Sequence, residues 1–282
     1  MNNIKTVLLL GVLTGLFLFV GGAIGGHGGM MIALVLAAVM NLGAYWFSDK
    51  IVLHTYGAQP LSESDAPDIH RMVEELCQRA HMPKPQIYVI DEESPNAFAT
   101  GRNPEHAAIA VTTGIMKLMS REELRGVIAH ELSHVRHRDT LISTISATIA
   151  GAIMFLAHMM QMFAFFGGGN SDDDNRGGNL IGLLVMAILA PIAATMIQMA
   201  ISRSREYKAD LGGAELTHNP EGLASGLEKL GYYSRRIPLP ATNQTAHLFI
   251  VSPLSGKSFI NLFSTHPPLE ERIARLRAIR LG

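Results

Sequence analysis

His130, Glu131 and His134 lie in the run HELSH, and their types and spacing are those of a metal-dependent hydrolase site. Side chains four positions apart on a helix lie one above the other, so His130 and His134 can point two imidazoles at one metal ion. Glu131 lies about 100° further round the helix, close enough to act as a general base beside that metal. A surface helix with two solvated histidines gives the same spacing. The motif therefore predicts a zinc peptidase site only if its surroundings supply further ligands.

The composition predicts a membrane protein. Of the 282 residues, 48% are hydrophobic and only 17% are charged, with a mean hydropathy of +0.22. An ordinary soluble enzyme is more polar. The net charge of −1 gives no field that would attract nucleic acid, so no nucleic-acid partner is expected. The single cysteine, Cys77, excludes an internal disulfide and fits a reducing compartment.

Four apolar runs are each long enough to cross roughly 30 Å of hydrocarbon, and we predict them to be transmembrane helices. They cover residues 6–26, 28–48, 140–167 and 180–201. A glycine-rich hinge at 25–29 separates the first two, which predicts a helical hairpin. The alternative of a cleaved signal peptide is disfavoured because a second apolar run follows at once.

The basic residues that flank the four runs lie on one side of the predicted membrane, and the opposite loops hold only Arg176. The positive-inside rule therefore predicts that both termini and the polar segments are cytoplasmic.

The polar segments predict an α+β domain. An amphipathic helix over 64–82 precedes three strands, which we expect at 86–90, 96–101 and 107–112. Ser120 and Glu123 form a capping box that starts the motif helix, and this helix is expected to run on into the third apolar run. Two further helices are expected at 219–234 and 269–279.

Glu206 is the best candidate for a third zinc ligand. The hairpin of the third and fourth apolar runs brings His134 and Glu206 to similar heights, roughly 10 Å and 8 Å from the membrane along a helix. Asp210, one turn later, could accept a hydrogen bond from a ligand imidazole and fix its tautomer. His137 is a conceivable ligand as well. The alternative is that Glu206 and Asp210 belong to a charged membrane boundary.

His266 is a candidate catalytic residue in the run THPP that precedes the last predicted helix. Pro267 and Pro268 would hold it rigidly, and a histidine outside the ligand set can stabilise an oxyanion in zinc peptidases of this broad class. The alternative is that His266 only buttresses the fold.

Four stretches together resemble a known family. HELSH followed by Asp139, SREYKAD, NAFATG upstream and STHPPLEERI downstream resemble the HtpX-type membrane zinc peptidases, which are relatives of the CAAX-processing membrane proteases. The resemblance covers nearly the whole chain. It implies one Zn²⁺ per chain on His130, His134 and Glu206, with Glu131 as the general base. It also implies an integral inner-membrane protein with a cytoplasmic active site that acts in membrane-protein quality control.

The resemblance makes the segment 96–101 an edge strand that pairs with the substrate backbone. An extended peptide that adds to a sheet edge gains backbone hydrogen bonds with little sequence preference, which predicts broad specificity. The residues expected to contact substrate are Asn96, Ala97, Phe98, Ala99 and Thr100.

Together these arguments predict a mainly α membrane protein with four transmembrane helices and a cytoplasmic α+β zincin-like (gluzincin) catalytic domain with a small sheet. The predicted parts are a transmembrane hairpin (1–48), the first part of the catalytic domain (49–140), a second hairpin (141–202) and the second part of the catalytic domain (203–282).

The predicted function is a multi-pass zinc metalloendopeptidase of the bacterial inner membrane. It would act on misfolded membrane proteins or unfolded polypeptides, and its partners are these substrates and the lipid bilayer. A membrane protein without proteolytic activity, stapled by a zinc ion with a fourth ligand such as His137 or His266, is the alternative. A narrower processing protease is another. The oligomeric state is not determined by the sequence.

Overall fold

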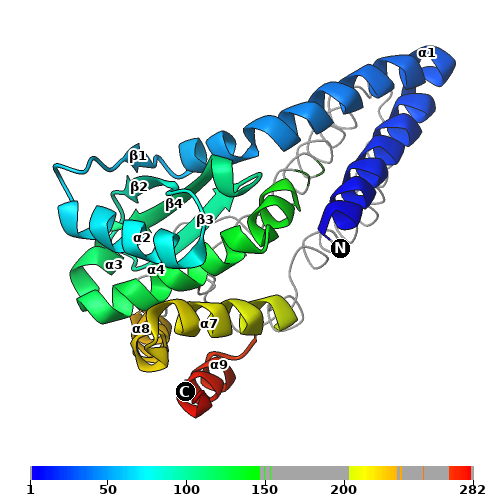
Figure 1. Ribbon diagram of the computed structural model, residues 1–282. Helices are drawn as coiled ribbons and strands as arrows, with labels where there is room; N and C mark the ends of the chain where they lie inside the picture. Colours follow the sequence, from blue (N-terminus) through cyan, green and yellow to red (C-terminus); the bar gives the residue numbers. More distant parts are fainter. Residues whose placement is uncertain are drawn as a thin grey trace, which may run out of the picture.

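The structure is a computed structural model that describes residues 2–146, 149, 153, 203–233, 236, 250 and 267–280. In Figure 1 these residues form a long helical arm beside a body that contains a small sheet with helices packed against it. Most of the third and fourth predicted spans, and His266, lie outside the described residues.

The arm is α1 (Asn2–Thr55), and it reverses direction at Gly26, where φ is +55°. Asn41 Nδ2 donates a hydrogen bond to Thr14 Oγ1 at 2.8 Å. In a straight helix these two residues would be roughly 40 Å apart, so the two halves of α1 must lie side by side. The reversal falls in the glycine-rich segment that the sequence marks as a hinge.

One helix among the described residues is long and apolar enough to cross a membrane, judged by length and composition. It covers Gly26–Phe47 in the second half of α1, with a mean hydropathy of 1.9. Leu10–Gly22 in the first half is apolar but shorter. Large apolar side chains are exposed along both halves, as on a surface that meets lipid. The structure therefore supports one of the four predicted spans as a clear candidate.

The sheet has four strands in the order β1 (Gln59–Pro60), β2 (Gln86–Ile90), β4 (Ala107–Thr112) and β3 (Ala97–Gly101). β2 and β4 are parallel, and the other two pairs are antiparallel. The three predicted strands are present, and β1 is an addition. β3 lies at one edge of the sheet, as expected.

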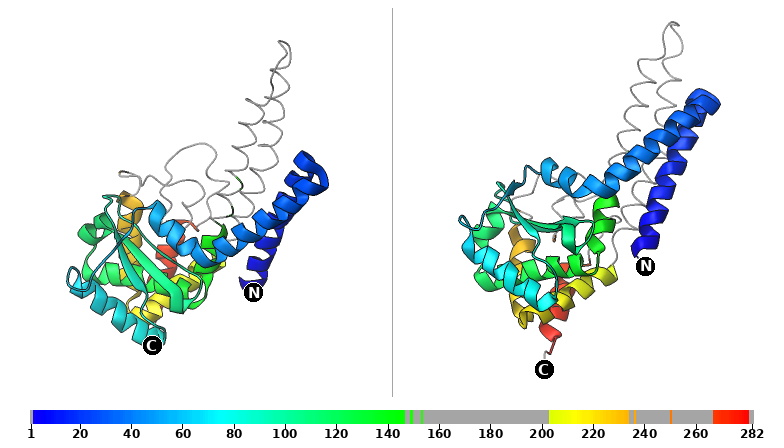
Figure 2. Two further views of the ribbon diagram at one scale, coloured as in Figure 1. Left: turned by 90° about the horizontal axis from the view of Figure 1, so that it is seen from above. Right: turned by 45° about the horizontal axis from the view of Figure 1, so that its top comes forward.

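Alternate residues of the strands face opposite sides of the sheet, and each side has its own cover. Ala97, Ala99 and Ile109 belong to the main core, which the sheet shares with α2 (Pro67–Ala80) and α4 (Arg121–Arg136). On the other side, the last turns of α1 cover the sheet, and the buried residues there are Val52, Leu53, Ile90, Phe98, Ala108 and Ala110. Figure 2 shows α1 running from the arm onto this side of the sheet.

A short connection, η1 (Pro104–His106), links β3 to β4, and α3 (Thr113–Leu118) follows β4. The predicted capping box then starts α4: Ser120 Oγ accepts from Glu123 N, and the Glu123 carboxylate accepts from Ser120 N.

The prediction that the motif helix continues into the third apolar run is wrong. α4 ends at Arg136, Arg138 has a φ of +58°, and a new helical segment begins at Asp139. The left-handed conformation of Arg138 is incompatible with a continuing right-handed helix. The break turns Asp139 back toward the motif.

Two later helices cover α4. They are α7 (Arg203–Thr217) and α8 (Pro220–Tyr233), and α9 (Leu269–Ala278) packs against both of them. α7 comes so close to α4 at the motif that a Cβ on Gly213 would lie 3.0 Å from the backbone nitrogen of His130. The glycine thus permits the approach that brings the first turn of α7 to the motif histidines.

Candidate metal centre

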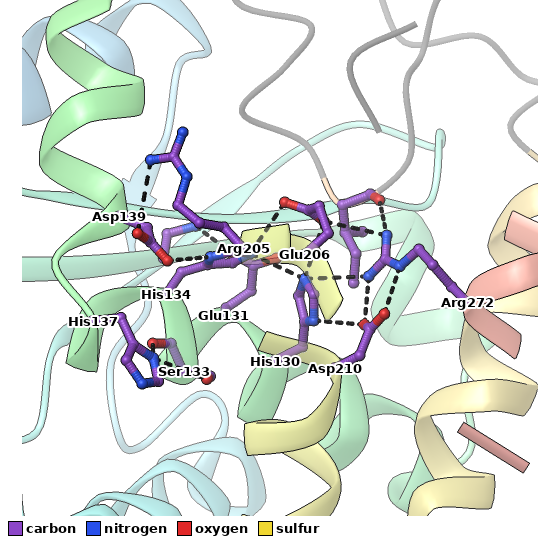
Figure 3. A network of polar contacts seen from close by, with 12 residues as sticks. His130, Glu131, Ser133, His134, His137, Asp139, Arg205, Glu206, Asp210 and Arg272 are labelled. Atoms are coloured by element: carbon purple, nitrogen blue, oxygen red, sulfur yellow. Dashed lines mark hydrogen bonds and ion pairs between the residues drawn. The ribbon is translucent and has the colours of Figure 1, made fainter. Parts of the chain in front are cut away.

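α4 supplies His130 and His134, and the first turn of α7 supplies Glu206. The two Nε2 atoms lie 3.2 Å apart, and His134 Nε2 lies 3.5 Å from Glu206 Oε1. His130 Nε2 lies 3.8 Å from Glu206 Oε2. Figure 3 shows the three side chains converging on one point.

This donor set suits a zinc ion. Tetrahedral zinc with Zn–N bonds of about 2.0–2.1 Å separates two ligand nitrogens by roughly 3.3–3.4 Å, close to the 3.2 Å between the two Nε2 atoms. Among the described residues, these three form the group of histidine, cysteine and carboxylate side chains that could hold a metal, with donor atoms all within 4.8 Å of one another. Three protein ligands leave a coordination position for water, as at a catalytic site.

Asp210 follows Glu206 by one turn of α7 and lies beside His130. Its Oδ1 is 3.0 Å from His130 Nδ1, so the other ring nitrogen faces the metal position. Burial lowers the pKa of His130 to about 4 despite the neighbouring carboxylate, and the imidazole is therefore neutral near pH 7, as a metal ligand must be.

Asp139 has the corresponding position beside His134. Its Oδ2 lies 3.4 Å from His134 Nδ1, and its Oδ1 lies 3.7 Å from the Nη1 of Arg205. Burial lowers the pKa of His134, but Asp139, Glu206 and Glu131 outweigh burial and raise it to about 9. The sequence assigns no role to Asp139 within its motif. Its contact with His134 depends on the turn at Arg138, which only the structure shows.

Arg272 is the site residue that the sequence analysis missed. It is fully buried on α9 and donates to both oxygens of Asp210, at 2.9 and 2.7 Å. Its Nη1 lies 3.4 Å from Glu206 Oε2, and its Nη2 lies 3.3 Å from His130 Nε2. A signal was present: Arg272 stands three residues after Leu269 and four before Leu276, on the apolar stripe of the last helix.

Glu131 joins the motif helix to the edge strand. The carboxylate is buried, and its Oε2 accepts a hydrogen bond from Ala99 N at 2.9 Å. Burial raises its pKa to about 7 and outweighs the lowering effect of His134, and Glu206 contributes a further, smaller rise. A carboxylate with this pKa can both accept and release a proton near neutral pH.

The outer edge of β3 is occupied by other parts of the chain. Ala97 O accepts from Ile250 N at 3.3 Å, Ala99 N donates to Glu131, and Gly101 O accepts from Thr140 Oγ1 at 3.1 Å. A peptide that pairs with this edge must therefore displace existing contacts.

The predicted substrate residues point in different directions. Ala97 and Ala99 face the motif helix, whereas Phe98 packs against the end of α1. Thr100 Oγ1 pairs with Thr144 Oγ1 at 3.1 Å, and Asn96 Oδ1 accepts from Ala97 N at 3.0 Å. The side chains that lie toward Glu131 are thus the two smallest of the five.

His137 lies apart from the metal position. Its Nδ1 donates to Ser133 O at 2.8 Å, one turn back on α4, and Figure 3 shows its ring below the three converging side chains. His266, the other candidate for a fourth ligand, is outside the described residues.

Comparison with known proteins identifies relatives over the whole chain. The model of "Peptidase family M48" matches residues 63–280. A protein named "Protease HtpX homolog" from Syntrophobacter fumaroxidans is 60% identical over 280 residues, which cover 99% of each chain. One of the same name from Paraburkholderia phytofirmans is 55% identical, over 98% of this chain and 96% of the other.

A crystal structure of Ste24p from S. mikatae shares the fold, with a TM-score of 0.51 and 20% identity. The match covers 97% of this chain and 65% of the Ste24p chain. At this identity the likeness concerns the fold alone.

Proposed function

Because the chain belongs to peptidase family M48, and is a membrane metalloprotease like the HtpX homologues it matches, we propose that it hydrolyses peptide bonds of membrane proteins at the cytoplasmic face. Misfolded membrane proteins and unfolded polypeptides are the proposed substrates. The charge asymmetry of the apolar runs supports a multi-pass protein of the bacterial inner membrane with both termini in the cytoplasm.

The observation that carries this proposal is the convergence of His130, His134 and Glu206 beside the Glu131 carboxylate. We assign the three residues as ligands of one zinc ion per chain. When bound there, zinc supplies a Lewis acid that lowers the pKa of a water molecule to about 7 and polarises a substrate carbonyl.

The surrounding charges hold the ligands in place. Asp210 and Asp139 lie against the Nδ1 atoms of the two histidines and keep each Nε2 turned to the metal position. Arg272 pairs with Asp210 and Glu206 and offsets their negative charge in the protein interior.

Glu131 is the proposed general base and then the general acid. It takes a proton from the water that attacks the peptide carbonyl carbon, and it delivers this proton to the leaving amine nitrogen. Its pKa of about 7 suits both transfers at neutral pH. His266 is the proposed residue that stabilises the oxyanion.

The contacts along β3 suggest how a substrate is presented. Thr140 and Thr144 close the Gly101 end of the edge, so an extended peptide would pair with Ala97 and Ala99. It would replace Ile250 on Ala97 O and Glu131 on Ala99 N, which frees the Glu131 carboxylate for the attacking water. Recognition through backbone groups supports broad specificity, with a narrower processing protease as the alternative.

The test is Glu131→Gln in the full-length protein. We expect one zinc ion per chain to remain bound, measured by atomic absorption, while cleavage falls at least about 100-fold because the proton acceptor is lost. Glu122→Gln is the matched control, since Glu122 is an exposed carboxylate on the first turn of the same helix. His134→Ala should lose the zinc itself. Proteolysis retained in Glu131→Gln would rule out the assignment.

A further inference from the structure

The candidate span of α1 ends in three consecutive aromatic residues, Tyr45, Trp46 and Phe47. Trp46 is 48% exposed and Phe47 is 54% exposed. A cation lies over each: the Arg102 guanidinium is 4.5 Å from the centre of the Trp46 ring, and Lys50 Nζ is 5.8 Å from that of Phe47. Exposed aromatic rings with neighbouring cations at the end of an apolar helix are typical of the headgroup layer of a membrane.

Arg102 directly follows the edge strand β3, so this contact places the end of β3 at the level where α1 leaves the apolar region. A second contact marks the same end. Gly101 O accepts from Thr140 Oγ1, and Thr140 is the first residue of the next apolar run in the sequence. Two apolar segments, far apart in sequence, thus meet at the Gly101 end of β3.

The height of the sheet above this level is fixed by a continuous helix. α1 runs without a break from Phe47 to Val52 and Leu53, which pack with Phe98 on the face of the sheet away from the motif. Five or six residues of helix correspond to roughly 8–9 Å. No linker separates the candidate span from the domain that carries the motif.

The Glu131 carboxylate meets β3 close to this level. It contacts Ala99 N, and Ala99 lies two residues before Gly101, or about 7 Å along a strand. The headgroup layer adds about 5–7 Å. At about 3.3 Å per residue, a fully extended peptide that leaves the bilayer covers these roughly 12–14 Å in about four residues, and a less extended one needs up to about six.

We propose that Trp46 and Arg102 hold the Gly101 end of β3 in the headgroup layer. The resulting height of the site above the membrane restricts cleavage to peptide bonds within about six residues of the end of a substrate's own membrane span. The partner of this surface is the bilayer, whose anionic phosphates complement Arg102 and Lys50. The second part of the proposal rests on the proposed proteolytic function, and the first part does not.

The position of Trp46 in the headgroup layer can be tested without measuring proteolysis, because Trp46 is the single tryptophan of the chain. The full-length protein is reconstituted into vesicles of phosphatidylcholine with a minor fraction of phosphatidylglycerol, in which one lipid carries bromine at a shallow or a deep acyl position. We expect the shallow bromine to quench Trp46 fluorescence more strongly. Stronger quenching by the deep bromine, or quenching by neither, would overturn the proposed position of Trp46 in the headgroup layer.

The height is tested with single-span substrates in the same vesicles. One cleavable stretch is placed directly after the span or displaced by about 8, 16 and 24 residues, each adding roughly 3.3 Å when extended. We expect cut sites, mapped by mass spectrometry, to stay within about six residues of the span whatever the displacement. Cuts that follow the stretch to every distance would contradict the proposal.

Arg102→Glu tests whether the contact of Arg102 with the headgroup layer sets the distance between the cut site and the substrate's span. One basic residue near an anionic surface contributes about 1 kcal/mol, so we expect distant cuts to increase about fivefold or more relative to near ones. Lys117→Glu, the same charge change at an exposed site on α3, should leave the pattern unchanged. An unchanged pattern in Arg102→Glu would overturn the role of this residue.

A soluble unfolded polypeptide offered in detergent distinguishes failure of the height restriction from failure of the proposed proteolytic function. If the wild type cuts it and also cuts every displaced stretch equally, the height restriction is wrong and the protease assignment stands. If the wild type cuts neither it nor any membrane substrate, the proposed function itself fails.

Discussion

At the scale of single residues, the site is a buried set of alternating charges around the metal position. Asp210 and Asp139 each lie between a histidine of the proposed metal site and an arginine, Arg272 in the first case and Arg205 in the second. Without a metal ion, the carboxylates hold a proton on His134, whose pKa is raised to about 9. A divalent cation would take the place of that proton.

Zinc binding should therefore release about one proton at pH 7.5, because His134 is protonated below its pKa of about 9 and must be neutral to bind zinc. Zinc affinity should therefore rise with pH up to about 9. As the pH is lowered below about 9, the affinity should fall because His134 becomes protonated. Calorimetry of the metal-free protein in buffers of different ionisation enthalpy measures the proton count. An affinity independent of pH between 6 and 9 would contradict the charge state derived for His134.

Arg272→Met should destabilise the protein by about 3–5 kcal/mol, because Asp210 and Glu206 lose their buried counter-charge. Thermal unfolding of the full-length protein in detergent measures the effect. Arg275→Met on the same helix is the control, since the Arg275–Glu271 ion pair is exposed to solvent and its loss should change stability little. Equal losses in both variants would show that burial of Arg272 has no special role.

At the scale of elements, α4 is positioned by close backbone contacts with the helices that cover it. A Cβ on Gly126 would lie 2.6 Å from the backbone nitrogen of Leu223 on α8. This approach fixes α4 against α8, and a shift of α4 would move Glu131 away from Ala99. Glycine in a helix interior normally costs stability, so its presence here reflects the packing.

Gly126→Ala should accordingly lower the free energy of unfolding by about 1–3 kcal/mol, since the clash is with backbone that cannot rotate away. Gly226→Ala on α8 is the matched control, because its nearest neighbours lie at 3.4 Å, an ordinary contact distance. That variant should be neutral or slightly stabilising, owing to the better helix propensity of alanine. Thermal unfolding in detergent ranks the two, and a more stable Gly126→Ala would disprove the close packing.

At the scale of the whole molecule, α1 belongs to the membrane arm and to the catalytic body at once. Its first part carries the exposed apolar surface of the arm, and its last turns cover one face of the sheet. The same helix thus supplies part of the core beneath the edge strand. Contacts made after the candidate span should therefore determine the stability of the domain that holds the site.

Leu53→Ala should destabilise the catalytic body by about 2–4 kcal/mol, because Leu53 is buried against the sheet. Ile51→Ala, two residues earlier on the same helix, should have little effect, since Ile51 is 47% exposed. Hydrogen exchange of β3 amides in detergent measures the local effect. Equal protection of β3 in the two variants would separate α1 from the stability of the sheet.

The sequence by itself determined the local features of this protein. Apolar periodicity and strand patterns placed the elements, the glycine-rich hinge marked the reversal of α1, and the capping box marked the start of α4. Helical spacing put His130 and His134 on one face, and the matched heights of two apolar runs selected Glu206. The local inferences succeed because they depend on neighbours within a few turns, whereas the third and fourth spans and the zinc-ligand role of Glu206 stay predictions.

The tertiary structure alone decided which distant groups complete the site. Arg272 lies 142 residues from His130 in the sequence yet 3.3 Å from its ring, and Ala99 lies 32 residues from Glu131. Asp139 reaches His134 only because α4 breaks at Arg138. Buried charges are stable only when opposite charges meet them, and which ones meet depends on how α4, α7, α9 and β3 pack. Residue spacing along the chain therefore does not predict which of these charged side chains meet.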